Sequence, residues 1–112
     1  MDAAQSLREA TALSSQIERC AIVGGDGAAV AAVPAGAGET LARAAAELLD
    51  AAPRRPAATR SVEVGLDVGS VFVVTDGSRT AVATTGPEPT SALVLHDLRA
   101  CLQRISAEDS AA

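Results

Sequence analysis

Few side chains in this 112-residue chain are suited to acid–base or nucleophilic chemistry. His96 is the one histidine, so neither a catalytic triad nor a histidine-rich metal site can form within one chain. It lies off the apolar stripe of an expected helix, which predicts a solvent-facing residue rather than a catalytic base. Cys20 has no neighbouring base in the sequence, and Cys101 falls on the apolar stripe of that helix. Because a reactive thiol needs an exposed, electropositive setting, both cysteines are predicted to be separate, buried and inert.

Two glycine clusters have the composition of phosphate-binding loops but not the pattern. The cluster at residues 24–27 precedes a strand-like stretch rather than a helix, and the third glycine of the dinucleotide fingerprint is missing. Gly36 and Gly38 do precede a helix, whose N-terminal amides can bind an anion. However, the chain has no lysine for a Walker-type loop, and Glu39 would repel phosphate. These clusters are predicted to be turns and a helix start, and no cofactor is predicted.

The remaining polar candidates are turn carboxylates and an arginine pair. Asp26, Asp67 and Asp76 each fall in a predicted turn, where an aspartate suits the local geometry, so a catalytic carboxylate pair is disfavoured. Arg54 and Arg55 follow the second expected helix and fit either a partner contact or a solvated pair. Without a convergent polar cluster, the sequence favours a binding module over an enzyme.

The hydrophobic pattern predicts the elements that would carry these residues. Apolar side chains recur at helical spacing in three segments, whereas five shorter segments either alternate or are continuously apolar. The helices are expected at residues 2–17, 39–52 and from 90 or 91 to 105, and the strands at 20–23, 28–33, 61–66, 71–75 and 80–85. Glycine–aspartate turns separate several of the strands, as in β-hairpins.

This order predicts an α+β fold. Helices on both faces of a five-stranded, mainly antiparallel sheet would form a three-layer α-β-α sandwich, in the chain order α-β-β-α-β-β-β-α. Residues 1–105 are expected to form a single domain, and residues 106–112 a flexible C-terminal tail.

Composition narrows the classes of partner. The net charge is −5, and Phe72 is the one aromatic residue, so the clustered cations and stacking platforms of nucleic-acid-binding proteins are missing. No apolar run approaches the length of a membrane span, and the N-terminus lacks the pattern of a secretory signal. Cytoplasmic localisation is therefore expected, and the use of arginine without lysine suggests a GC-rich bacterial source.

The element order resembles that of the roadblock/LC7 family. The resemblance is carried by residues 17–27, by the alanine-rich second helix and by residues 71–77 with the strand and helix that follow them. It extends over residues 2–105, nearly the whole chain, and implies a profilin-like architecture. The segment at 86–90 departs from it, because the family often has a small polar entry to the last helix.

The resemblance implies a non-catalytic regulatory dimer. Members of the family act as scaffolds, as dynein-associated light chains or as regulators of Ras-like small GTPases, and prokaryotic members can accelerate GTP hydrolysis by positioning the GTPase's own residues. The expected function is therefore a dimeric regulator or scaffold for a Ras-like GTPase, with the chain pairing with itself or with a paralogue. The alternatives are a light-chain-like structural adaptor without GTPase binding, a small-molecule sensor and, last, an enzyme.

The strand at 61–66 is expected to form the dimer surface, because it alternates as a sheet edge does and has neither lysine nor proline to protect that edge. Pairing with its own copy about a two-fold axis would satisfy its free backbone groups. The second helix is expected to meet its mate across the same axis and to present its charged side to the partner. The predicted dimer residues are Val62, Glu63, Val64, Leu66, Leu41, Ala45 and Leu48. The predicted partner-binding residues are Arg43, Glu47, Asp50 and Arg54. The alternative is a monomer with a solvated helix face.

Overall fold

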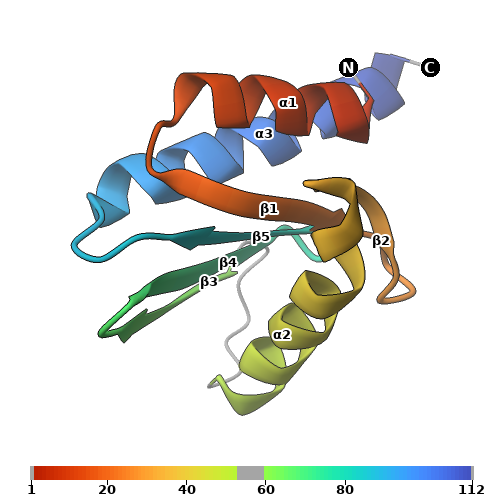
Figure 1. The fold of residues 1–112 in the computed structure, drawn as a ribbon. Helices are drawn as coiled ribbons and strands as arrows, with labels where there is room; N and C mark the ends of the chain where they lie inside the picture. Colours follow the sequence, from red (N-terminus) through yellow and green to blue (C-terminus); the bar gives the residue numbers. More distant parts are fainter. Residues whose placement is uncertain (1, 53–59, 112) are drawn as a thin grey trace.

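One antiparallel sheet of five strands lies at the centre of the computed structural model, which describes residues 2–52 and 60–111 (Figure 1). The strands are β1 (Ile17–Val23), β2 (Ala29–Val33), β3 (Arg60–Leu66), β4 (Gly69–Thr75) and β5 (Thr80–Thr85). Their order across the sheet is β2-β1-β5-β4-β3. Strand β5 is therefore central, and β2 and β3 are the two edges.

Three helices cover the two faces of this sheet. They are α1 (Ala3–Leu13), α2 (Gly38–Ala51) and α3 (Ser91–Ala111), and a short 3₁₀ helix, η1 (Ala35–Ala37), leads into α2. Helices α1 and α3 lie together on one face, and α2 lies alone on the other (Figure 1). This arrangement confirms the predicted α+β, three-layer fold and its element order.

The pleat of the strands divides the core into two clusters. On β1, Cys20 and Ile22 pack toward α1 and α3, whereas Ala21 and Val23 pack toward α2. All four side chains are buried, which explains why this stretch is continuously apolar rather than alternating. Phe72 is fully buried in the cluster beneath α1 and α3.

Helix α2 approaches the sheet closely because its inner face is small. Ala42 and Ala45 are buried beside Leu41 in the second cluster. At the start of the helix, a Cβ on Gly38 would lie 3.1 Å from the Cβ of Ala29 on β2, so only glycine fits there without a shift. The helix contacts β1, β2 and β5 more extensively than it contacts β4 or β3.

Two predicted helix ends differ from the structure by several residues, and β1 and β4 begin earlier than their predicted starts at residues 20 and 71. The first helix was expected to run to residue 17, but α1 ends at Leu13 and Ile17 begins β1. Ser14 has extended backbone, and strand pairing with Thr85 buries the Ile17 side chain to 8% exposure. Helical spacing alone cannot decide between a helix and a strand at residue 17, because an apolar side chain suits a buried position in both.

At the C-terminal end, α3 is helical to Ala111, through most of the predicted tail. The division into a domain at 1–105 and a flexible tail stays a prediction.

Gly69, at the start of β4, has no room for a side chain. A Cβ at this position would collide with the backbone carbonyl of Thr85 on β5, and its φ is +156°. We therefore expect Gly69→Ala to destabilise the fold by about 2 kcal/mol or more, because the two central strands must separate to admit the methyl group. Urea unfolding followed by circular dichroism measures this change.

Gly36 supplies the matched control. A Cβ at Gly36 meets nothing within 4 Å, so Gly36→Ala should leave stability unchanged within about 0.5 kcal/mol, or raise it slightly. Equal midpoints for the two variants would contradict the assignment of Gly69 to a close backbone approach.

Candidate protein-interaction surface

The histidine and the two thiols do not come together: His96 is on the surface, whereas both cysteines lie in the core. His96 is exposed on α3, away from both core clusters, as the sequence predicts. Cys20 and Cys101 are free thiols, fully buried in the cluster beneath α1 and α3. Among the described side chains, in residues 2–52 and 60–106, no group of histidine, cysteine and carboxylate residues is arranged to hold a metal ion.

The environment of the two thiols suppresses their reactivity. Burial, with a smaller effect from Cys101, raises the pKa of the Cys20 thiol from 9.0 to about 12. Burial also raises the pKa of Cys101, although the hydrogen bond from Ser6 and the positive charge of Arg104 oppose this change. The Ser6 hydroxyl lies 3.1 Å from the Cys101 sulfur. Both cysteines are therefore protonated at neutral pH and serve as packing residues.

The turn aspartates are occupied by their own turns. Asp26 accepts a hydrogen bond from the amide of Ala28 at 3.1 Å. Asp76 accepts from the amides of Ser78 and Arg79, each at 2.8 Å. These contacts shape the β1–β2 and β4–β5 connections, which agrees with the structural roles predicted for both residues.

The start of α2 does not resemble a phosphate loop. Gly36 lies in η1, Ala37 occupies the cap position, and no side chain caps the helix there. Glu39 stands in the first turn and forms an exposed ion pair with Arg43 at 3.3 Å. A carboxylate at this end of the helix competes with any anion for the terminal amides.

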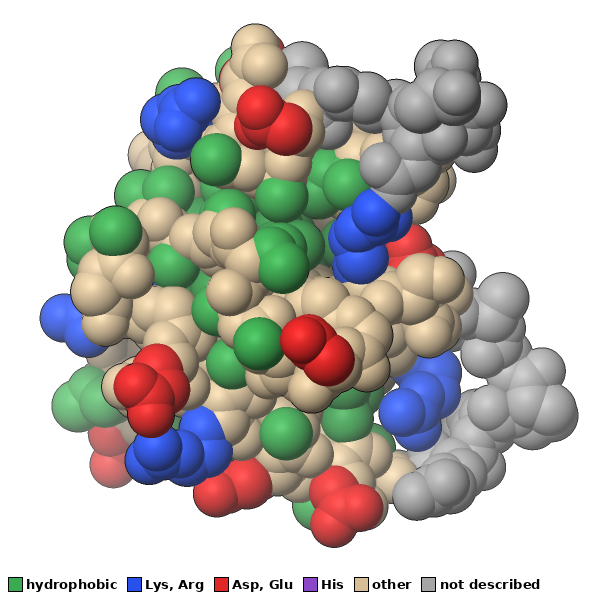
Figure 2. Space-filling model, turned by 90° about the vertical axis from the view of Figure 1, so that its right-hand side faces the viewer, with side chains coloured by type: hydrophobic (Ala, Val, Ile, Leu, Met, Phe, Trp, Pro, Cys, Tyr) green, Lys and Arg blue, Asp and Glu red, His purple; other side chains and the backbone are tan. Residues whose placement is uncertain are grey.

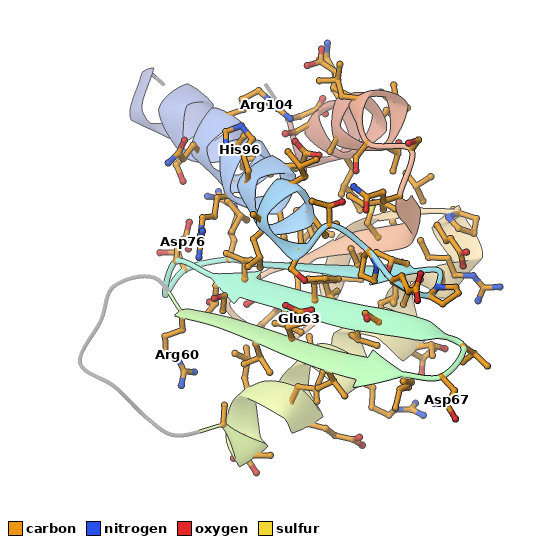
Figure 3. The ribbon with its side chains drawn as sticks, turned by 90° about the vertical axis from the view of Figure 1, so that its left-hand side faces the viewer. Arg60, Glu63, Asp67, Asp76, His96 and Arg104 are labelled. Carbon is orange, nitrogen blue, oxygen red and sulfur yellow. The ribbon has the colours of Figure 1, made fainter. Side chains whose placement is uncertain are left out.

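Strand β3 is a sheet edge, as the sequence predicts (Figure 3). Its side chains alternate between the two faces of the sheet. Val62 and Val64 are half-buried on the α2 side, where Val62 contacts the second cluster. Glu63 points toward α3, where its carboxylate accepts a hydrogen bond from the Ser91 hydroxyl at 2.7 Å (Figure 3). Leu66, at the end of the strand, is 59% exposed.

An apolar strip therefore lies uncovered beside this edge. It comprises Val62, Val64, Leu66 and the half-buried Val71 of β4. The register pairs Val62 with Val73 and Val64 with Val71. Of these four valines, Val73 alone is fully buried, and it packs in the cluster beneath α2. Three residues of this edge strip, Val62, Val64 and Leu66, belong to the predicted dimer surface, and the structure adds Val71 of β4.

The helix residues predicted for the dimer surface divide into two groups. Leu41 and Ala45 are 5% and 2% exposed and pack against their own sheet, so almost none of their surface is left for a second chain. Leu48 is half-buried at the margin of the same cluster and keeps part of its side chain accessible. Of the apolar residues predicted for the dimer surface, Val62, Val64, Leu66 and Leu48 therefore keep accessible surface.

The predicted partner-binding side of α2 is solvent-facing. Arg43, Glu47 and Asp50 are all exposed, and the Arg43 side chain retains 69% of its accessible surface beside Glu39. Arg54 lies outside the described residues.

Two features were not anticipated from the sequence. The first is a pair of side-chain contacts between β3 and α3. One is the hydrogen bond from Ser91 to Glu63, and in the other Ser61 accepts from Arg99 at 3.5 Å. The second is that β2 is the opposite edge of the sheet. Nothing in a local pattern distinguishes an edge strand from an inner strand when neither is charged, and β2 contains only alanine and valine.

Solved structures with the same fold are known. A roadblock/LC7 domain from Streptomyces avermitilis is similar with a TM-score of 0.71 and 16% sequence identity, over 90% of this chain and 95% of that chain. Another structure of a roadblock/LC7 domain from that organism gives a TM-score of 0.74 and 15% identity, over 96% and 98% of the two chains. Profilin IA from Acanthamoeba castellanii gives a TM-score of 0.58 and 15% identity, over 93% and 97%.

The chain therefore has the roadblock/LC7 fold, with a profilin-like architecture. This confirms, at the level of the fold, the resemblance seen in the sequence. The sequence itself matches no protein-family model and no curated protein. Among the described helices, none combines the length and the apolar character that crossing a membrane requires.

The buried thiols should make stability fall at alkaline pH. The chain has no lysine and no tyrosine, so cysteines are the side chains that titrate between pH 9 and 12. Burial raises both native pKa values above the 9.0 of the unfolded thiols, so the stabilisation is complete below pH 9.0 and is lost at higher pH. For Cys20 this loss continues to a pH of about 12, because the unfolded chain has released a proton that the native chain retains. We expect the unfolding free energy to fall by up to about 1.4 kcal/mol per pH unit for each thiol in this window.

Urea unfolding of the wild type and of Cys20→Ala at several pH values measures this slope. The variant should be less stable at neutral pH, because it loses a packed sulfur, yet should show the shallower alkaline slope. Identical slopes in the two proteins would show that Cys20 is ionised in the native state.

Proposed function

We propose that this protein is a non-catalytic dimeric regulator or scaffold that binds a Ras-like small GTPase. The observation that carries the proposal is the edge strip on β3, an apolar surface beside an unpaired strand on a roadblock/LC7 fold. Such an edge is an aggregation hazard unless it is charged, shortened or covered. A second copy of this chain, or a paralogue, supplies that cover.

The geometry of β3 suits pairing about a two-fold axis. A seven-residue antiparallel pair joins the two sheets, and Val62 and Val64 of each copy meet on the α2 side. The strand carries one charge of each sign, Arg60 near its start and Glu63 at its middle. Leu48 lies on the neighbouring helix and extends the apolar surface of the proposed dimer.

The exposed side of α2 is the proposed partner surface. Arg43, Glu47 and Asp50 project into solvent on a helix whose other side is anchored in the core. Mixed charges on a rigid helix favour orientation and a fast encounter with a complementary partner rather than affinity alone. Arg54 belongs to this proposal from the sequence, as does the cytoplasmic setting.

The proposed role needs no catalytic group in this chain. The two thiols are buried and protonated, and His96 stands alone on an exposed helix face. A regulator of this kind acts by holding the GTPase's own loops and side chains in position.

The dimer is tested by changing the edge strip. Val64→Glu places a carboxylate in the apolar strip that both copies would bury, so we expect the dimer to dissociate while the half-exposed site tolerates the change in the monomer. Light scattering at micromolar concentration measures the mass, and circular dichroism checks the fold. Val30→Glu, on the opposite edge strand, is the matched control and should remain dimeric. A wild-type mass equal to one chain would overturn the dimer.

The partner surface is tested by charge changes on α2. With a Ras-like GTPase from the same genome as the probe, Arg43→Glu should weaken binding at least about tenfold in calorimetry while the dimer persists. Arg43→Gln separates loss of the positive charge from the repulsion that a new carboxylate would feel from Glu39 and Glu47. Arg8→Glu, on the exposed side of α1, is the control. No binding of any such GTPase in either nucleotide state, by a chain that dimerises, would remove the GTPase role and leave the adaptor role.

A further inference from the structure

Strand β2 forms the edge of the sheet opposite β3. It is five residues long and consists of alanine and valine alone, with no charge and no internal proline to discourage pairing. The register with β1 pairs Ile22 with Ala31 and Val23 with Ala29, so Val30 is left without a partner and is 58% exposed. Figure 2 views the molecule from the side on which β2 lies and shows apolar side chains at the surface with scattered charged groups.

A groove of about 710 Å³ runs beside this edge, between β2 and α2. Its walls are small: Ala29 and Ala32 contribute from β2, and Ala42 and Ala46 from α2. The volume falls in the range of about 300–1,000 Å³ that is typical of ligand pockets. The groove is therefore wide because the side chains that line it are short. Bulky side chains of another chain would fill it.

The rim of the groove carries no net charge. Glu39 and Arg43 are the charged residues that line it, and they neutralise each other in their 3.3 Å ion pair. A charged segment laid along β2 would therefore find no free counter-charge among the residues that line the groove. An uncharged segment matches both the strand and the rim.

We propose that β2 binds an extended, uncharged segment of a partner protein, which adds to the sheet as a further strand and places bulky apolar side chains in the adjoining groove. The unpaired backbone of an edge strand specifies an extended occupant, because main-chain hydrogen bonds provide the contact. Alternate side chains of an added strand point to one face, and here one such set faces α2 and the groove. The binding unit is about as long as the five-residue β2.

A second copy of this chain is a poorer occupant. Pairing β2 with its own copy would bring only alanine and valine to the groove, which leaves much of its volume empty. The proposal uses contacts within one chain and the edge opposite β3, so it stands or falls independently of the dimer and of GTPase binding.

The test is a nuclear magnetic resonance titration of the whole chain with a capped peptide that alternates threonine with isoleucine and phenylalanine. We expect saturable shifts of the amides of β2 and of the α2 residues that line the groove, with slowed amide exchange in β2. A peptide with proline at its centre should not bind, because it lacks a ladder donor at that position.

Two variants and one control make the test specific. Val30→Lys places a charge on the edge strand, and Ala46→Leu partly fills the groove at an exposed helix position; each should abolish saturable binding. Leu93→Lys makes the same kind of change at 54% exposure on α3, outside every proposed surface, and should bind the peptide as the wild type does. The proposal is overturned by the absence of shifts, by shifts on β3, by equal binding of the proline peptide, or by β2 shifts that arise on concentrating the chain without peptide.

Discussion

The structure depends on a mismatch of widths between one helix and a five-stranded sheet. Strands lie about 4.8 Å apart, so five of them span roughly 19 Å, whereas a helix with its side chains is about 10 Å wide. Two helices, α1 and α3, cover one face, but α2 has the other face to itself. It packs against β1, β2 and β5 through an alanine-rich side and leaves the valines of β3 half-exposed. The surplus apolar surface beside β3 follows from this geometry and is the reason to expect a second chain there.

The same close packing encloses the two thiols in the interior, where they are shielded from reagents. With one aromatic residue and many alanines, the core is filled by short side chains on closely spaced elements, and the two thiols are enclosed among them. Burial holds both thiols protonated, while Asp26 and Asp76 accept hydrogen bonds from nearby backbone amides. The surfaces proposed for function are the exposed side of α2 and the two sheet edges. These edges differ in kind, because β3 carries a charge of each sign and an apolar strip, whereas β2 is neutral and borders a groove.

Much of the fold was predictable because its signals are local and repeated. Hydrophobic spacing identified α2 to within one residue at each end, and β3 and β5 were found by their alternation, their β-branched residues and the Asp76–Gly77 turn. The end of α1 was wrong because an apolar residue at position 17 satisfies helical spacing and strand burial equally well. Leu41 and Ala45 were assigned to a subunit interface because an apolar helix side has the same pattern whether it faces its own sheet or another chain.

By itself, the sequence determined the element order, the type of fold, the burial of both cysteines and the exposure of His96. Each of these follows from the positions of polar and apolar side chains, which repeat every two residues in a strand and every 3.6 residues in a helix. Only the tertiary structure decided that β2 is the second edge, that α2 leaves a strip of β3 uncovered, and that alanines from two separated segments line a groove. These properties depend on which strands become neighbours and how far one helix extends across them. Strand order arises from contacts between residues far apart in the chain, which no local pattern encodes.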